Sequence, residues 1–215
     1  TWSFRDREQA MSLGGRRLPV VTMTAPSAPG HVVDPGLLDR LVDKIVARPL
    51  ADRMTAVEPF TGRALADFPV SVPDDVDAAF RAARLAQPGC AARPVEERAR
   101  IVGRIHELIL DRQSMIADLV QAESGKARRD AFEEIGDVAL AARYAAARGP
   151  RLLRDHRRLG LIPGLTIAIE VRHPVGIVGV ISPWNYPLTL AISDSLPAFV
   201  AGNAVVHKPD TQGVL

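Results

Sequence analysis

The sequence predicts an α/β fold, in which an N-terminal helical region precedes the first β-α-β part of a nucleotide-binding sheet. Two observations predict it. Apolar residues recur at helical spacing over much of residues 34–148, whereas the almost continuous apolar run VGIVGVI at 175–181 is typical of a strand buried on both faces. The segment 174–211 then follows the order strand, loop, helix, glycine-containing turn and strand, which is that of a β-α-β unit.

The N-terminal elements follow from helical periodicity and its breaks. A helix is expected over residues 34–47, followed by a hairpin over 54–70 that turns at Thr61-Gly62. The next helix is expected to begin at Asp74 or Asp75 and to end at the breaker Gln87-Pro88-Gly89. These elements precede the long helical part of the chain.

A long helical zone is expected from residue 94 to about residue 148. Ser124-Gly125 is predicted to interrupt it, and Gly149-Pro150 to end it. The arginine-rich run RLLRDHRR at 151–158 has no interleaved aromatic residues, so we interpret it as a solvated linker. After it, the alternation of residues 165–171 predicts a half-buried strand.

The composition is that of an ordinary globular protein and excludes several classes. Of the 215 residues, 47% are hydrophobic and 24% charged, which excludes a disordered chain, a collagen and a coiled coil. The formal net charge of +2 produces no strong field for nucleic acid or a membrane surface. No apolar run reaches the ~20 residues that span a bilayer. We therefore expect no nucleic-acid partner and no membrane association.

The single cysteine, Cys90, excludes an internal disulfide framework and any zinc site with several Cys ligands. A lone thiol fits the reducing cytoplasm, which is the expected localisation. Four histidines stand without a second ligand at metal spacing, so no metal site is expected. They are His106, His156, His173 and His207.

The first residues are expected to contribute nothing to the fold. The chain begins with Thr1, and Met23 opens the stretch MTAPSAPG, which is typical of a natural start. We therefore predict that residues 1–33 are disordered or an extension. Residues 34–215 are expected to form the folded part of the chain, as an incomplete domain.

The β-α-β unit is expected to bring two sets of polar residues to one edge of its sheet. Ligands of such sheets gather at the carboxyl ends of the parallel strands. Residues 182–185 follow the first strand and Lys208 follows the second, so they share a rim if the two strands are neighbours. Neither a G-x-G-x-x-G motif nor a P-loop is present, so glycines alone do not predict phosphate binding. The pattern by itself fits an ordinary α/β domain with a proline-rich loop equally well.

At these residues the sequence resembles the NAD(P)-dependent aldehyde dehydrogenase family. The resemblance rests on three blocks in matching order and spacing, Pro174-x-Gly176, Ile181-x-Pro183-Trp184-Asn185-x-Pro187 and Ala201-Gly202-Asn203-x-Val205-x-x-Lys208-Pro209. Weaker similarity extends upstream to residues 60–62 and 123–126. Within the family, Lys208-Pro209-Asp210-Thr211 with Asp194-Ser195 before it is most similar to bacterial NADP-dependent succinate-semialdehyde dehydrogenases. The implied fold is the first β-α-β part of a Rossmann-like cofactor domain.

The resemblance implies roles for these residues. Asn185 is implied to be the oxyanion-hole amide that donates its side-chain N–H to a thiohemiacetal oxygen, and a preorganised donor of this kind contributes ~3–4 kcal/mol. Trp184 is implied to line the cofactor cleft beside the nicotinamide, and Lys208 to contact the adenosine ribose and any phosphate on it. Taken alone, Asn185 fits a turn residue and Trp184 a core residue. The whole implied cofactor-binding set is Ile181, Ser182, Pro183, Trp184, Asn185, Lys208, Pro209, Asp210 and Thr211.

Thr211 bears on the choice of cofactor. Family members that require NAD commonly have a glutamate in this place, which accepts a hydrogen bond from the ribose 2′-hydroxyl and repels a 2′-phosphate. A neutral Thr211 close to Lys208 removes that repulsion, so NADP is expected and NAD is the less favoured alternative. Asp210 leaves the choice open, because its carboxylate could point either way.

The family reaction also needs a thiolate nucleophile and a glutamate base, both expected beyond the Lys208-Pro209 block. Cys90 is expected between two N-terminal helices, away from these motifs. Glu123, Glu133 and Glu134 are expected at helix surfaces or caps.

We therefore expect the truncated N-terminal portion of an aldehyde dehydrogenase, which is inactive alone. Its parent reaction would oxidise a small-molecule aldehyde to a carboxylic acid with NADP. The alternative is a residual cofactor-binding or subunit-interaction module without catalysis. Full-length relatives are implied to be homo-oligomers, and the oligomeric state of this chain stays open.

Overall fold

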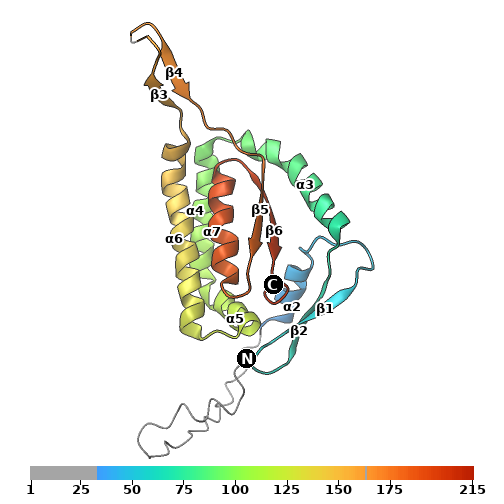
Figure 1. Ribbon diagram of the computed structural model, residues 1–215. Coiled ribbons are helices and arrows are strands. Elements are labelled where there is room, and N and C mark those ends of the chain that lie inside the picture. Colours follow the sequence, from blue (N-terminus) through green and yellow to red (C-terminus); the bar gives the residue numbers. More distant parts are fainter. Residues whose placement is uncertain (1–32, 163) are drawn as a thin grey trace, which may run out of the picture. The chain divides into compact units, whose positions relative to one another are not determined.

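The structure, a computed structural model, describes residues 33–162 and 164–215 (Figure 1). Apart from Val33, the predicted N-terminal extension lies outside the described residues. The described part has the mixed α/β architecture that the sequence predicts. In chain order its elements are α2 (Pro35–Val42), β1 (Arg53–Val57), β2 (Ala64–Pro69), α3 (Pro73–Ala91), α4 (Val95–Asp111), α5 (Gln113–Ser124), α6 (Arg128–Leu153), β3 (His156–Leu159), β4 (Ile167–Glu170), β5 (Ile177–Ser182), α7 (Pro187–Val200) and β6 (Ala204–Pro209).

The first two strands form the predicted hairpin. β1 and β2 pair antiparallel, and Gly62 lies in their connection with a φ of +69°, a backbone conformation that favours glycine. The hairpin prediction is therefore confirmed, including its turn at Thr61-Gly62. Helix α2 ends at Val42, earlier than the predicted residue 47.

Helix α3 continues through Pro88, so its predicted end at residues 87–89 is wrong. The carboxylate of Asp75 accepts a hydrogen bond of 2.9 Å from the N–H of Val72 and thereby caps the start. Pro88 has no N–H to donate to the carbonyl four residues earlier. That carbonyl belongs to Arg84, an exposed residue. The helix ends at Ala91.

The core lies between α4, α6 and α7, which run side by side (Figure 1). One face of α6 carries small and β-branched apolar residues at helical spacing, and this face is buried against the other two helices. Burial of each such Val or Ile contributes about 1.5–3 kcal/mol. The largest apolar side chains that are at most 1% exposed are Val102, Ile135, Val138 and Val200.

Two glycines, Gly125 and Gly149, lie at the positions where the sequence predicts breaks before and after α6. Gly125 has a φ of +72° and ends α5, which confirms the predicted interruption at Ser124-Gly125. The predicted end at Gly149-Pro150 is wrong, because α6 continues to Leu153. A Cβ atom on Gly149 would lie 2.5 Å from Cγ1 of Val200, so this glycine sits where α6 and α7 touch. That packing holds the turn helical although Pro150 has no N–H to donate.

The third and fourth strands form an antiparallel hairpin that projects from the helices (Figure 1). The segment predicted as a solvated linker is instead the end of α6 followed by β3. β4 is not half-buried as predicted, because Ile167 is 70% exposed and Ile169 58%. Arg158 and Glu170 form an ion pair of 2.5 Å across the two strands.

The last two strands pair in parallel and are joined by α7. The register runs from Ile177 opposite Ala204 to Ser182 opposite Pro209. The expected adjacency of the two strands is therefore confirmed. Full burial of the first strand on both faces is not, because Val180 is buried while Ile181 is 79% exposed. Phe80 of α3 reaches the neighbouring Gly179, and nothing in the described part of the chain extends far enough to cover Ile181.

Candidate functional site

The carboxyl ends of β5 and β6 form one rim. Ile181 lies opposite Lys208 in the parallel register, and Ser182 lies opposite Pro209. Residues 183–186 leave the sheet at this edge to enter α7, and residues 210–213 leave it beside them. The structure thus brings together the two groups of predicted site residues, which are separated by more than twenty positions in the sequence.

Asn185 lies in the exposed connection between β5 and α7. Its backbone carbonyl accepts a hydrogen bond of 2.6 Å from Nζ of Lys126. Within the described residues, its side-chain amide has no hydrogen-bond partner, so its N–H groups are available to a ligand. Trp184, before it, is 50% exposed and therefore is not a core residue.

The end of β6 presents a cation and a hydroxyl. Among the residues that the structure describes, Nζ of the exposed Lys208 donates only to the adjacent carbonyl of Pro209, at 3.2 Å, and Thr211 is exposed. Asp210 accepts a hydrogen bond of 3.0 Å from the N–H of Gln212. Its carboxylate therefore caps its own turn.

Ser182 and His207 are hydrogen-bonded just inside the rim. Ser182 is 3% exposed, and its Oγ lies 2.7 Å from Nε2 of His207. Partial burial of the imidazole, and to a smaller degree the Lys208 cation, lower the pKa of His207 below its ordinary value. The Ser182 hydroxyl is thus hydrogen-bonded to the adjacent strand, whereas Trp184 and Asn185, which follow in the loop, are exposed.

The turn after β6 packs against the loop after β5. A Cβ atom on the buried Gly213 would lie 3.4 Å from Cβ of Pro187 and 3.6 Å from Cα of Trp184. Further on, Oε1 of Glu123 accepts a hydrogen bond of 2.6 Å from the N–H of Leu215. Burial raises the pKa of Glu123 to about 7, against the opposing effect of backbone hydrogen bonds from Leu215 and Val214.

Sequence reasoning missed Lys126 and Glu134. Glu134 and Glu123 were expected at helix surfaces or caps, but they are 0% and 6% exposed, and only Glu133 is on the surface as expected. The carboxylate of Glu134 bonds to Lys126 and to the first turn of α7. The one signal in the sequence is the helical spacing of Ala131, Ile135 and Val138, because position 134 falls on the same face of α6.

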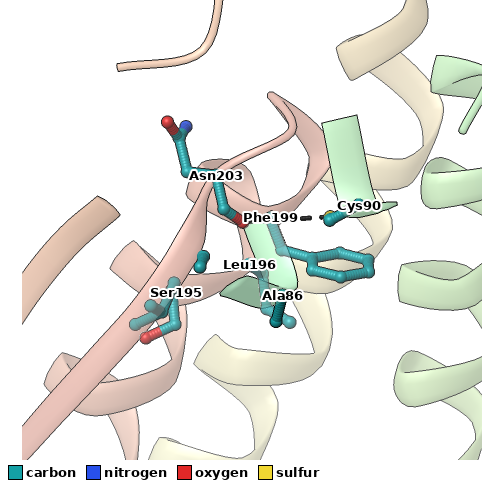
Figure 2. Close-up of a pocket in the computed structure, with 8 residues that line it drawn as sticks. Ala86, Cys90, Ser195, Leu196, Phe199 and Asn203 are labelled. Carbon is teal, nitrogen blue, oxygen red and sulfur yellow. Dashed lines mark hydrogen bonds between the residues drawn. The ribbon is translucent and has the colours of Figure 1, made fainter. Parts of the chain in front are cut away.

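A cavity of about 310 Å³ lies elsewhere, at the amino end of β6 (Figure 2). Cys90, in the last turn of α3 rather than between two helices, is half-buried there with Sγ 3.9 Å from the carbonyl oxygen of Asn203. None of the predicted site residues lines it, and it lies at the end of β6 opposite to Lys208. The lining residues are Ala86, Cys90, Ser195, Leu196, Phe199, Asn203, Ala204 and Val205.

A metal site or a membrane-spanning helix would point to other functions. No cluster of three or more His, Cys, Asp and Glu side chains in residues 33–162 and 164–215 is arranged to hold a metal ion. In the same ranges, every helix is too short or too polar to cross a membrane.

Comparison with known proteins identifies the family. The model of the aldehyde dehydrogenase family matches residues 46–215. The chain belongs to this family. The aldehyde dehydrogenase blocks noted above, at 174–176, 181–187 and 201–209, all lie within the match.

Two mycobacterial aldehyde dehydrogenases are close in sequence. A protein of Mycolicibacterium smegmatis with the provisional name succinate-semialdehyde dehydrogenase [NADP(+)] is 54% identical over 155 residues, 72% of this chain and 30% of that protein. One of Mycobacterium tuberculosis, with the provisional name succinate-semialdehyde dehydrogenase [NADP(+)] 2, is 46% identical over 192 residues, 88% of this chain and 36% of the relative. The chain thus spans about a third of the length of these relatives.

Solved aldehyde dehydrogenase structures share the fold. The NAD-dependent benzaldehyde dehydrogenase of Corynebacterium glutamicum is 34% identical with a TM-score of 0.71, over 77% of this chain and 36% of that one. The NADP-dependent glyceraldehyde-3-phosphate dehydrogenase of Bacillus halodurans, solved with NADP, is 34% identical with a TM-score of 0.70, over 75% and 35%. Both nicotinamide cofactors therefore occur among the structural relatives.

Proposed function

We propose that the rim formed by β5 and β6 binds NADP and that the protein oxidises succinate semialdehyde to its acid. The observation that carries this proposal is that two parallel strands end at one rim, where β5 leads into the loop of Asn185 and β6 carries the exposed Lys208. Ligands of open α/β sheets bind at that edge.

The chemistry of the donor set fits NADP. Lys208 supplies a cation for the ribose and its 2′-phosphate, and Thr211 supplies an exposed hydroxyl without a negative charge. One carboxylate oxygen of Asp210 accepts a hydrogen bond from the N–H of Gln212, which offsets part of its negative charge. Trp184, with Ile181 and Pro183, would provide the apolar surface for the nicotinamide. When bound, NADP supplies the hydride acceptor.

Asn185 would stabilise negative charge on the substrate oxygen. Its side-chain N–H groups have no partner among the described residues, and its backbone is held by Lys126. A fixed donor aimed at developing charge does not need to reorient during the reaction, which is why it lowers the barrier. This is the only catalytic role that we assign to a residue of this chain.

The names of the mycobacterial relatives support succinate semialdehyde as the substrate. The nucleophilic thiol and the glutamate base of the family reaction are not assigned to any residue here. We therefore expect the reaction to depend on these two groups as well as on the residues described here.

The test is reduction of NADP with succinate semialdehyde by the full-length protein, followed at 340 nm. Asn185→Ala is expected to lower kcat about 100-fold or more, because it removes one oxyanion donor, while the KM for NADP stays within about twofold. Gln113→Ala, which removes an exposed amide at the start of α5 and away from this rim, is the matched control. Absence of turnover by the wild-type protein, or full activity of Asn185→Ala, would contradict the proposal.

A further inference from the structure

A buried ion pair lies behind the loop that carries Asn185. Lys126 follows α5, Glu134 lies on α6, and Nζ of the lysine forms a salt bridge with Oε1 of the glutamate. The Glu134 side chain is 0% exposed and that of Lys126 14%. A carboxylate buried to this degree costs stability unless each of its oxygens is paired. Both oxygens of Glu134 are paired, and the second one accepts hydrogen bonds from N–H groups directly after the loop.

Lys126 holds the loop at its centre. Its Nζ donates a hydrogen bond of 2.6 Å to the backbone carbonyl of Asn185, 59 positions along the chain. The same ammonium lies 4.3 Å from the centre of the Tyr186 ring, within range of a cation–π interaction. One cation therefore contacts two consecutive residues of the loop and fixes the peptide plane between them.

Glu134 holds the end of the loop, where α7 begins. Its Oε2 accepts hydrogen bonds of 3.1 Å from the N–H groups of both Leu188 and Thr189. The first N–H groups of a helix have no partner within the helix, and a negative charge is favourable at this end of the helix dipole. Glu134 therefore fixes the point at which the chain turns from the loop into α7.

We propose that Lys126 and Glu134 are positioning residues that set the direction of the Asn185 side-chain amide. The proposal rests on the proposed function, in which this amide donates to the substrate oxygen. An amide in an exposed loop has no packing of its own to orient it, so the backbone anchors on either side decide where it points. Misplacement by about 1 Å can cost on the order of 100-fold in rate.

A purely structural role for the pair makes a different prediction, and a double-mutant cycle separates the two. Lys126→Met keeps the aliphatic stem and removes the cation, and we expect kcat to fall about tenfold or more while the KM for NADP stays within about threefold. In an Asn185→Ala background the same change is expected to lower kcat by less than about twofold. Lys126→Arg, which keeps the cation, is expected to recover part of kcat. Equal effects of Lys126→Met in both backgrounds would overturn the proposal.

Amide hydrogen exchange tests the anchor without any activity. Glu134→Ala removes the acceptor of Leu188 and Thr189, and their exchange is expected to accelerate about tenfold or more. Glu133→Gln, the exposed neighbour on the same helix, is the matched control and is expected to leave both rates unchanged. Unchanged rates in Glu134→Ala would overturn the proposal. Should Glu134→Ala fail to fold, the Lys126 cycle decides the question.

The two hypotheses can fail separately. If the wild-type protein oxidises no aldehyde while Glu134→Ala accelerates exchange at the two amides, the anchor is supported and the proposed function is overturned. If the wild-type protein is active while the exchange rates and kcat of the Lys126 and Glu134 variants equal those of wild type, the positioning role is overturned and the function is supported.

Discussion

Ser182 on β5 and His207 on β6 are joined across the parallel pair, with Oγ and Nε2 2.7 Å apart. Burial is the main cause of the lowered pKa of His207, and the Lys208 cation adds to it, so the neutral ring is favoured at pH 7. The hydrogen bond lies one position inside the rim on β6. A proton added to this ring would place a second positive charge beside Lys208.

This pair predicts a loss of stability in acid. Because the pKa of His207 is lowered in the folded state, the unfolded state binds more protons below about pH 6.5, and the free energy of unfolding falls as the pH decreases. His207→Gln should lose that part of the pH dependence, measured by urea unfolding at pH 5 and 7.5. His173→Gln, an exposed histidine outside the strands, is the control. Equal pH dependence in His207→Gln and wild type would contradict the prediction.

For Glu123 we expect a pH dependence of the opposite sign, in which the free energy of unfolding falls as the pH rises. Its pKa is raised to about 7 by burial, so the folded state binds more protons than the unfolded state between about pH 4.5 and 7. The stabilising contribution is complete below pH 4.5 and is lost as the pH rises through 7, by up to about 3 kcal/mol. Glu123→Gln should remove this decline, whereas the exposed Glu96→Gln should keep it. A decline of the same size in Glu123→Gln would exclude this carboxyl as its source.

Two glycines of α6 should respond to alanine in opposite ways. Gly149→Ala places a Cβ atom 2.5 Å from Cγ1 of Val200 and is expected to destabilise the fold by about 1–3 kcal/mol. Gly136 has no atom within 4 Å of such a Cβ, so Gly136→Ala should stabilise by about 0.5–1 kcal/mol through helix propensity. Thermal unfolding of the two variants measures both. Destabilisation by Gly136→Ala, or none by Gly149→Ala, would contradict the packing of α6 against α7.

Thr211 should control the choice between NADP and NAD. Thr211→Glu adds a carboxylate close to the exposed Lys208, where it would repel a 2′-phosphate, so we expect the affinity for NADP to fall about tenfold or more. NAD, which lacks that phosphate, should bind at least as well as before. Thr211→Gln, which adds a side chain of the same shape as glutamate without its charge, is the control. Equal losses of affinity for both cofactors would show that residue 211 does not discriminate the 2′-phosphate.

The β-α-β unit could be predicted because each of its parts carries a local signal. The apolar run of β5, the proline-rich loop before α7 and the turn at Gly202, with a φ of +93°, are all visible in the sequence. The exposure of β4 was not predictable in this way. Alternation describes which side chains share a face of a strand, and it does not say whether anything covers that face.

The anchors of Asn185 could not be predicted because they act over a distance in the chain. Lys126 is 59 positions from Asn185, and Glu134 is 54 from Leu188. A glutamate on a helix is usually solvated, so local propensity predicted a surface position for Glu134. Its burial becomes understandable only when α7 places two unpaired N–H groups opposite α6.

The most direct test of the central claim, that the rim of β5 and β6 binds NADP, is a calorimetric titration of NADP into wild-type protein and Lys208→Ala. Loss of a charged hydrogen bond of this kind corresponds to about 10- to 100-fold in affinity. We predict a weakening of that size in Lys208→Ala and none in the exposed Lys44→Ala. Equal affinity of wild type and Lys208→Ala for NADP would contradict the account.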